Sequence, residues 1–204
     1  MLKFNRLPTV AAAALLLLLG SSTSFAGRYN SKLNIGDKAP DFQNIIGVDD
    51  KEHSLSDYKD AKAIVLIFTC NSCPVAQACE HRFIELQKDY ESRGVQVIAI
   101  NVNNLDEDKL PAMKKRAKQH GFPFPYLYDP TQKVARDYGA AVTPHIFVLD
   151  QNRKLVYMGA PDDAPLNESH VKKNYLRDAL NATLSGKKPA ISETRQKGCG
   201  IQYD

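Results

Sequence analysis

Apolar and polar positions follow one another in blocks along this chain, so that strand-like runs are separated by helix-like segments. Two runs, the entirely apolar 63–68 and the mostly apolar 95–102, have the length and the β-branched content of buried strands. Between them, apolar residues in 74–92 mostly recur every three or four positions, which is the spacing of one helical face. Gly94 is expected to end this helix before the second strand begins.

The same alternation continues through the second half of the chain. The pattern predicts helices over 106–119, 131–138 and 169–184, and strands over 125–128, 146–149 and 154–158. The last two strands flank the turn-forming segment Asp150-Gln151-Asn152-Arg153, which predicts a β-hairpin. Strands that alternate with helices and end in a hairpin favour an α/β fold, in which a central mixed sheet has helices on both faces.

Residues 1–26 have the pattern of a secretory signal peptide. Lys3 and Arg6 give a positive start, 10–19 is an unbroken apolar run, and Ser24-Phe25-Ala26 supplies small residues for cleavage after Ala26. The apolar run is shorter than the ~20 residues of a membrane-spanning helix, so an uncleaved anchor is the less favoured alternative. We therefore expect an exported protein, periplasmic or secreted, without stable membrane insertion.

The rest of the chain, residues 27–204, has the length of one domain. We expect the domain to span 27–186 and a polar tail to follow over 187–204. The net charge is +4 for the whole chain, and basic residues are interleaved with acidic ones. This distribution does not favour a nucleic-acid-binding surface.

The segment Cys70-Asn71-Ser72-Cys73-Pro74 stands between the first predicted strand and the helix that follows it. Two thiols at this spacing can close and reopen a disulfide, and a helix N-terminus favours the reactive thiolate. In an oxidising compartment the pair would rest as a disulfide unless a partner reduces it. A single CxxC pair is a weak zinc signal, and c-type haem attachment would need histidine in place of Pro74. We therefore predict that Cys70 and Cys73 are redox-active and need no cofactor.

The chain has two further cysteines, Cys79 and Cys199, outside the CxxC motif. Cys79 lies about 240° around the helix from Cys73 and is expected to be a small buried apolar residue. Cys199 lies in the polar tail between two glycines. It could pair with Cys79 as a structural disulfide, resolve an oxidised cysteine of the CxxC motif, or cross-link two chains. Sequence alone does not choose among these pairings.

Five segments of the chain match the pattern of one protein superfamily. They are Gly36–Phe42, Leu55–Tyr58, Phe68–Pro74, Val142–Val148 and Gly198–Ile201. Through these segments the chain resembles the thioredoxin-fold redoxins of the alkyl hydroperoxide reductase/thiol-specific antioxidant superfamily, and within them an exported peroxiredoxin-like subgroup. The resemblance implies a thioredoxin-like fold, and it is more specific for the fold than for the activity.

Thr143-Pro144 occupies the position of the cis-proline in that fold. A proline cannot donate a hydrogen bond to a sheet, so it suits the first position of the strand that follows. The resemblance implies that this peptide bond is cis and that Pro144 packs against the CxxC motif. It also predicts Thr143 and Pro144 as substrate-binding residues, with the backbone of Thr143 free to pair with a substrate strand.

Histidines near the motif raise the alternatives of a pH-sensitive neighbour or a metal ligand. His145 follows the proline, and a packed strand histidine is the favoured interpretation. His81 and Glu80 are expected at the surface of the helix after the motif. A histidine together with Cys70 and Cys73 could bind Cu(I), but copper-delivery proteins of this fold have a longer spacing between their cysteines.

The chain departs from both thioredoxins and peroxiredoxins around the motif. Thr69 stands where thioredoxins have tryptophan, and Pro74 follows the second cysteine, which predicts that Cys73 caps the helix. In the peroxiredoxin register P-x-x-x-T-x-x-C, Cys73 takes the peroxidatic position and Cys70 the threonine position. Leu66 takes the place of the motif's proline, and no arginine stands just before Ile146 in the place of the family's catalytic arginine. A dedicated peroxidase is therefore not favoured.

These features favour an exported thiol–disulfide oxidoreductase. One thiolate attacks a substrate disulfide and the other resolves it, with a slight preference for Cys70 as attacker because its loop is expected to be more accessible. The alternatives are a thiol-dependent peroxidase resolved by Cys199, a copper-binding chaperone and a redox-inactive binding domain. The expected partners are protein or small-molecule disulfides, peroxides in the alternative case, and a redox partner that the sequence does not identify.

Overall fold

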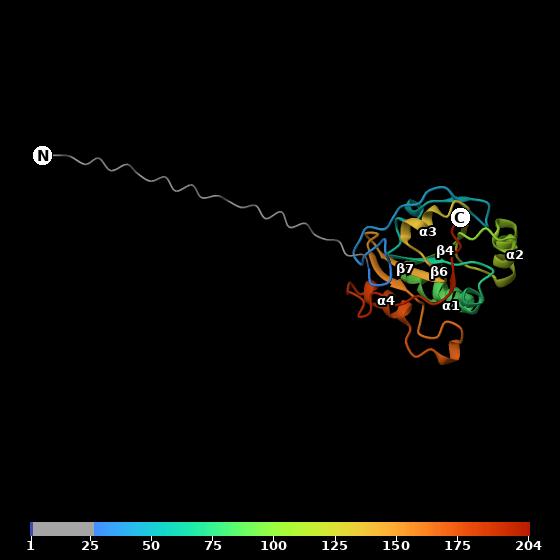
Figure 1. The fold of residues 1–204 in the computed structure, drawn as a ribbon. Helices are drawn as coiled ribbons and strands as arrows, with labels where there is room; N and C mark the ends of the chain where they lie inside the picture. The colour runs from blue at the N-terminus through green and yellow to red at the C-terminus, as the bar shows by residue number, and fades with distance from the viewer. Residues whose placement is uncertain (2–26) are drawn as a thin grey trace.

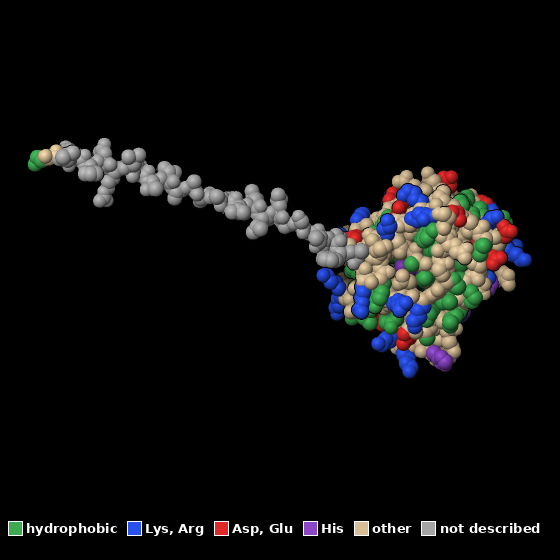
Figure 2. Space-filling model, viewed as in Figure 1, with side chains coloured by type: hydrophobic (Ala, Val, Ile, Leu, Met, Phe, Trp, Pro, Cys, Tyr) green, Lys and Arg blue, Asp and Glu red, His purple; other side chains and the backbone are tan. Residues whose placement is uncertain are grey.

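The computed structural model describes Met1 and residues 27–204. Apart from Met1, the predicted signal peptide therefore lies outside the described residues. Within the described part, no helix combines the length and the apolar character needed to cross a membrane. On the face shown in Figure 2, Lys and Arg side chains are scattered over the surface rather than gathered into one patch.

A seven-stranded mixed sheet forms the centre of the molecule. Its order is β2-β1-β5-β4-β3-β7-β8. The strands are β1 (Ile45–Gly47), β2 (Glu52–His53), β3 (Ala63–Phe68), β4 (Val95–Asn101), β5 (Tyr126–Tyr128), β7 (His145–Asp150) and β8 (Leu155–Gly159). Strands β3, β4 and β5 are parallel, β7 pairs antiparallel with β3, and β8 pairs antiparallel with β7. Every residue of β3 is buried, which explains its unbroken apolar run.

Helices cover both faces of this sheet (Figure 1), so the predicted α/β class is confirmed. The helices are α1 (Pro74–Tyr90), α2 (Leu110–His120), α3 (Lys133–Tyr138) and α4 (Tyr175–Leu184). Because side chains alternate along a strand, Val65 of β3 belongs to one apolar cluster with Phe83 of α1 and Leu180 of α4. The next residue, Leu66, belongs to the opposite cluster with Tyr138 of α3.

The helix predicted over 106–119 is interrupted. Asp106–Asp108 forms only a 3-10 turn, η3, and Lys109 is extended with φ −71° and ψ 158° before α2 begins at Leu110. The physical reason is that the Asp108 side chain does not stay with the helix but reaches the CxxC loop, as described below.

The last helix also begins later than expected. Only Tyr175–Leu184 is α-helical, after a 3-10 turn, η4, at Glu168–His170. The Asp163 carboxylate accepts hydrogen bonds from the backbone N–H groups of Lys172 at 2.9 Å and Lys173 at 3.1 Å. These donors are thus satisfied by a side chain rather than by a helix.

The segment 187–204, expected to be irregular, packs against the domain. Its strand β9 (Cys199–Gly200) pairs antiparallel with β6 (Val142–Thr143). Farther back, Met158 of β8 donates its N–H to the carbonyl of Ser192 at 3.0 Å and accepts from the N–H of Thr194 at 3.1 Å. Strands of two residues carry no periodic sequence signal, so neither β6 nor β9 could be predicted from the pattern.

His145, at the start of β7, is a packed strand histidine, as favoured by the sequence. It is 1% exposed, its ring lies 4.5 Å from that of Phe147, and its Nδ1 accepts a hydrogen bond from the Ala141 N–H at 3.4 Å. Burial lowers the pKa of His145 to about 3.

This burial predicts a loss of stability in mild acid. The unfolded chain binds a proton at His145 near pH ~6.5, whereas the folded protein does not until about pH 3, so falling pH favours unfolding. We expect this residue alone to remove about 2 kcal/mol from the free energy of unfolding between pH 7 and pH 5. Urea unfolding at both pH values would show a smaller loss for His145→Asn than for wild type. The exposed His81→Asn variant is the control, and equal losses in wild type and His145→Asn would contradict the prediction.

Candidate active site

The CxxC segment connects the end of β3 to the start of α1. Cys73 is the N-cap residue of α1, with extended backbone angles, and its sulfur accepts a hydrogen bond from the Ala76 N–H at 3.4 Å. Pro74 occupies the first turn, where the missing N–H has no intrahelical partner to lose. The predicted capping position of Cys73 is therefore confirmed.

Both cysteines of the motif are buried as free thiols. Cys70 is 1% exposed and Cys73 is 2% exposed, so the expectation that Cys70 is the more accessible one is wrong. The sulfur of Cys70 lies 3.2 Å from the Thr143 hydroxyl and 3.4 Å from that of Ser72. A surface pocket beside the motif is lined by Cys73 and Cys199 but not by Cys70. Cys73 therefore faces the pocket together with Cys199, whereas the side chain of Thr143 packs against Cys70.

The two thiols differ in their tendency to ionise. The hydrogen bond with Cys70 lowers the pKa of Cys73 below the usual thiol range, and contacts with Cys199 and the Ala76 amide act in the same direction against burial. That same hydrogen bond, with burial, raises the pKa of Cys70 well above its usual range. The N-terminus of α1 also favours negative charge on Cys73. The site is therefore arranged to hold one thiolate, on Cys73.

The Thr143-Pro144 peptide bond is cis, as expected. The carbonyl oxygen of Thr143 lies 3.0 Å from the sulfur of Cys73 and accepts from it when it is a thiol. The backbone of Thr143 is not free, however, because it pairs with Cys199 in β9. The sulfur of Cys199 lies 2.7 Å from that of Cys73. Of the pairings left open by the sequence, the structure brings Cys199 to the CxxC motif.

Asp108 is a buried carboxylate that holds the CxxC loop in place. One of its oxygens accepts hydrogen bonds from the backbone N–H groups of Asn71 at 2.6 Å and Ser72 at 3.1 Å. The other accepts from the Ser72 hydroxyl at 2.6 Å. Asn101, at the end of β4, donates its side-chain amide to the carbonyl of Asp108 at 3.0 Å. The role of Asp108 is not visible in the sequence, because three consecutive acidic residues, 106–108, fit the polar start of a helix.

Comparison with known proteins agrees with this geometry. The family model described as "AhpC/TSA family" matches residues 35–158, which include the CxxC motif and the cis-proline. The chain belongs to the AhpC/TSA family. The thiol-disulfide oxidoreductase ResA of Geobacillus thermodenitrificans is 32% identical over 149 residues, which is 72% of this chain and 82% of the relative.

Solved structures related to this AhpC/TSA chain establish its thioredoxin-like fold. An uncharacterised conserved protein from Geobacillus kaustophilus is 38% identical, with a TM-score of 0.78 over 86% of this chain and 95% of the other. A structure described as a putative thiol:disulfide interchange protein, DsbE, from Chlorobium tepidum is 31% identical, with a TM-score of 0.54 over 62% of this chain and 84% of the other.

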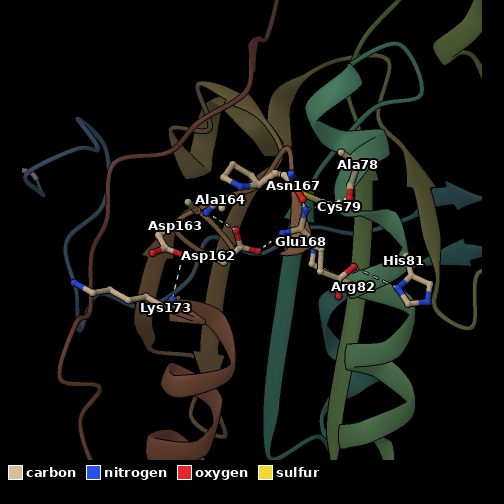
Figure 3. A network of polar contacts seen from close by, with 12 residues as sticks. Ala78, Cys79, His81, Arg82, Asp162, Asp163, Ala164, Asn167, Glu168 and Lys173 are labelled. Carbon is tan, nitrogen blue, oxygen red and sulfur yellow. Dashed lines mark hydrogen bonds and ion pairs between the residues drawn. The ribbon is translucent and has the colours of Figure 1, made fainter. Parts of the chain in front are cut away.

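Cys79 of this AhpC/TSA protein is a buried residue on α1, as expected. It is fully buried, its sulfur lies 3.4 Å from the carbonyl oxygen of Pro165, and burial raises its pKa to about 12. The neighbouring Arg82 forms an ion pair with Asp162, and it donates to the carbonyl oxygens of Ala78 at 3.1 Å and of Pro165 (Figure 3). Cys79 and Arg82 thus fasten the loop after β8 to α1.

Glu80 is not at the surface, which corrects the prediction. It is 8% exposed, and its carboxylate pairs with Arg116 of α2 at 2.5 Å and with His120 at 3.4 Å. The Arg116 cation on the neighbouring helix allows the charge to be buried. His81 is exposed as expected and lies 3.8 Å from Glu168. Among the described residues, no group of three or more His, Cys, Asp or Glu side chains is arranged to hold a metal ion.

The lowered pKa of Cys73 predicts an unusual pH profile for its alkylation. For an ordinary thiol, with a pKa of ~8.5, the ionised fraction falls by more than about tenfold between pH 8 and pH 6. Cys73, with its lowered pKa, stays ionised over this range. We expect the rate of iodoacetamide alkylation at Cys73, followed by mass spectrometry, to change little over this range. The same cysteine in urea-unfolded protein is the control. A folded-state profile that falls in step with the unfolded one would refute the assignment.

A second prediction concerns Asp108. Both carboxylate oxygens of Asp108 accept hydrogen bonds from the CxxC loop. In Asp108→Asn an NH2 group, which can only donate, replaces one of these oxygens, so a buried donor of the loop loses its acceptor. We expect the free energy of unfolding to fall by about 3 kcal/mol. The exposed neighbour Glu107→Gln is the matched control and should unfold as wild type does. Equal denaturation midpoints for the two variants would contradict the anchoring role.

Proposed function

We propose that this protein is a thiol–disulfide oxidoreductase in which Cys73 attacks and Cys70 resolves. The observation that carries the proposal is the position of Cys73 at the N-terminus of α1, where it accepts a hydrogen bond from Cys70 beside the cis-proline Pro144. Relatives of similar sequence are named thiol-disulfide oxidoreductases, which supports the same chemistry. The slight preference for Cys70 as attacker is replaced here by Cys73.

The reaction has two exchange steps. The Cys73 thiolate attacks one sulfur of a substrate disulfide, so a mixed disulfide forms and one substrate thiolate leaves and takes up a proton. Cys73 then carries no charge, and the main cause of the raised pKa of Cys70 is gone. Cys70 loses its proton and attacks the Cys73 sulfur, which forms the Cys70–Cys73 disulfide and releases the second substrate thiol. Two electrons pass from the enzyme to the substrate, and the reverse sequence oxidises a dithiol.

Thr143 and Pro144 are proposed to position the substrate. Thr143 lies directly against the two sulfurs, and a strand edge next to a cis-proline offers backbone hydrogen bonds to an extended chain. The substrates proposed are therefore disulfides of proteins or small molecules. Export, and the division into a domain over 27–186 with a tail over 187–204, are also proposed, on the sequence pattern.

Peroxide reduction is the second candidate, favoured by the short distance between Cys199 and Cys73. A peroxide would oxidise Cys73 to a sulfenic acid and leave as an alcohol or water, and Cys199 would condense with it to give a disulfide and water. Among residues 27–204, however, the polar groups in contact with Cys70 and Cys73 are thiols, hydroxyls and backbone groups, and no arginine is among them. Disulfide exchange is therefore the leading proposal.

Cysteine substitutions separate these two activities. We expect Cys73→Ser to form no mixed disulfide with oxidised glutathione. We expect the double variant Cys70→Ser, Cys199→Ser to accumulate one, because neither thiol that contacts Cys73 remains to resolve it. Intact-mass spectrometry detects the adduct, and the buried Cys79→Ala is the control that should behave as wild type. The adduct on Cys70 in Cys73→Ser protein would reverse the roles. Hydrogen peroxide consumed faster than disulfide by wild type would favour the peroxidase.

A further inference from the structure

The edge of β6 beside the cis-proline is occupied by the chain's own tail. In β9, Cys199 lies opposite Thr143 and Gly200 lies opposite Val142. The pairing continues past the strand, where the N–H of Ile201 donates to the carbonyl oxygen of Ala141 at 3.0 Å. One strand edge can pair with only one partner, so the tail and an external substrate strand exclude each other.

Gly198 permits the close approach of this strand. A Cβ atom at position 198 would lie 2.1 Å from the carbonyl oxygen of Thr143 and 2.7 Å from its carbon, both backbone atoms that cannot move aside. No other residue type fits there with the tail in place. At Gly200, by contrast, an added Cβ would meet no atom within 4 Å. Only the first of the two glycines that flank Cys199 is therefore required for seating the tail.

The residues after Cys199 are fixed to α3 and the turn before it. The side chain of Gln132 donates to the carbonyl oxygen of Gln202 at 2.9 Å and accepts from the N–H of Asp204 at 2.9 Å. Arg136 donates to the carbonyl oxygen of Asp204 at 2.7 Å, and its guanidinium lies 4.4 Å from the ring of Tyr203. The tail is therefore held at two places, by pairing with the β6 edge and by these contacts with α3.

The seated tail makes Cys73 the middle member of three sulfurs. Cys70 contacts it from within the CxxC loop, and Cys199 lies 2.7 Å away on the tail. Cys199 is half-buried and lines the same pocket as Cys73. A thiol held in this way reacts as an intramolecular partner at high effective concentration.

We propose that residues 198–200 are an internal substrate strand, and that Cys199 exchanges with the Cys70–Cys73 disulfide to give a Cys73–Cys199 disulfide. The proposal rests on the proposed function, which supplies the Cys70–Cys73 disulfide. In the step, the Cys199 sulfur loses its proton and attacks the Cys73 sulfur. The Cys73–Cys199 bond forms as the Cys70–Cys73 bond breaks, and Cys70 leaves as a thiolate that takes up a proton. No electrons are gained or lost overall.

This exchange closes the site. While Cys73 is bonded to Cys199, the β6 edge is covered and the attacking sulfur is blocked, so an external strand cannot react. Attack by Cys70 on Cys73 reverses the step and restores the free tail thiol. Reduction by a partner thiol also frees Cys199, but it returns Cys73 to a thiol and oxidises the partner. The oxidised enzyme is thereby protected until a reductant reaches it.

The test uses the full-length mature chain and the two glycines as a matched pair. Wild type, Gly198→Ala and Gly200→Ala are oxidised with diamide, their remaining thiols are blocked, and their disulfides are mapped by mass spectrometry. We expect wild type and Gly200→Ala to contain the Cys73–Cys199 bond with Cys70 free. In Gly198→Ala the share of this bond should fall at least about tenfold, because the tail thiol is no longer seated.

The outcomes separate this proposal from the proposed function. Oxidised wild type that contains only the Cys70–Cys73 bond, or equal shares of Cys73–Cys199 in both glycine variants, overturns the internal substrate and leaves the oxidoreductase intact. If the disulfides have the expected pattern but neither glycine variant reduces oxidised glutathione, the internal exchange is supported and the external activity is overturned. A faster turnover of oxidised glutathione by Gly198→Ala than by Gly200→Ala supports both.

Discussion

The site depends on the position of β3, which is hydrogen-bonded along both edges in the middle of the sheet. Its last residue, Phe68, lies opposite Ile100 of β4 on one side and His145 of β7 on the other. This register places the chain that leaves β3, with Cys70 and Cys73, directly beside the residues that enter β7, Thr143 and Pro144. A shift by one residue would turn every buried side chain of β3 to the opposite face, so the apolar core on both sides fixes the register. The geometry of the thiols is therefore a consequence of packing in β3, whose last residue lies two positions before Cys70 and five before Cys73.

Holding a thiolate in such a place requires more than a helix N-terminus. The CxxC loop runs through a nearly dry region, where its N–H groups need acceptors, and Asp108 supplies them. Its negative charge also adds to the raised pKa of Cys70, so the same carboxylate that orders the loop helps keep Cys70 protonated. A protonated Cys70 can donate to Cys73. Loop order and the division of charge between the two sulfurs thus have a common source.

The features that could be predicted from sequence are those with a local signal. The buried run 63–68, the proline after Cys73 and the proline before β7 each act within a few residues, and each was placed correctly. Asp108 and Glu80 were misplaced because their roles depend on partners 36 or 37 residues away: Asn71 and Ser72 for Asp108, and Arg116 for Glu80. A solvated carboxylate and a buried one look alike in a sequence. The predicted accessibility of Cys70 was wrong for the same reason, because Thr143, which packs against its sulfur, lies 73 residues farther along the chain.

The tail shows how such long-range pairing can regulate a site that is otherwise complete. The AhpC/TSA match ends at residue 158, and the residues proposed to react with an external disulfide, from Cys70 to Pro144, lie before that point. Cys199 therefore acts on the site by occupying it. β9 has two residues, and so short a ladder opens at a small cost in free energy when no covalent bond reinforces it. With Cys199 reduced, an external strand can displace the tail, whereas a bond to Cys73 makes displacement depend on breaking a disulfide. The oxidation state of one sulfur would then decide whether the β6 edge is open, and the anchors at Gln132 and Arg136 keep the displaced strand close enough to return.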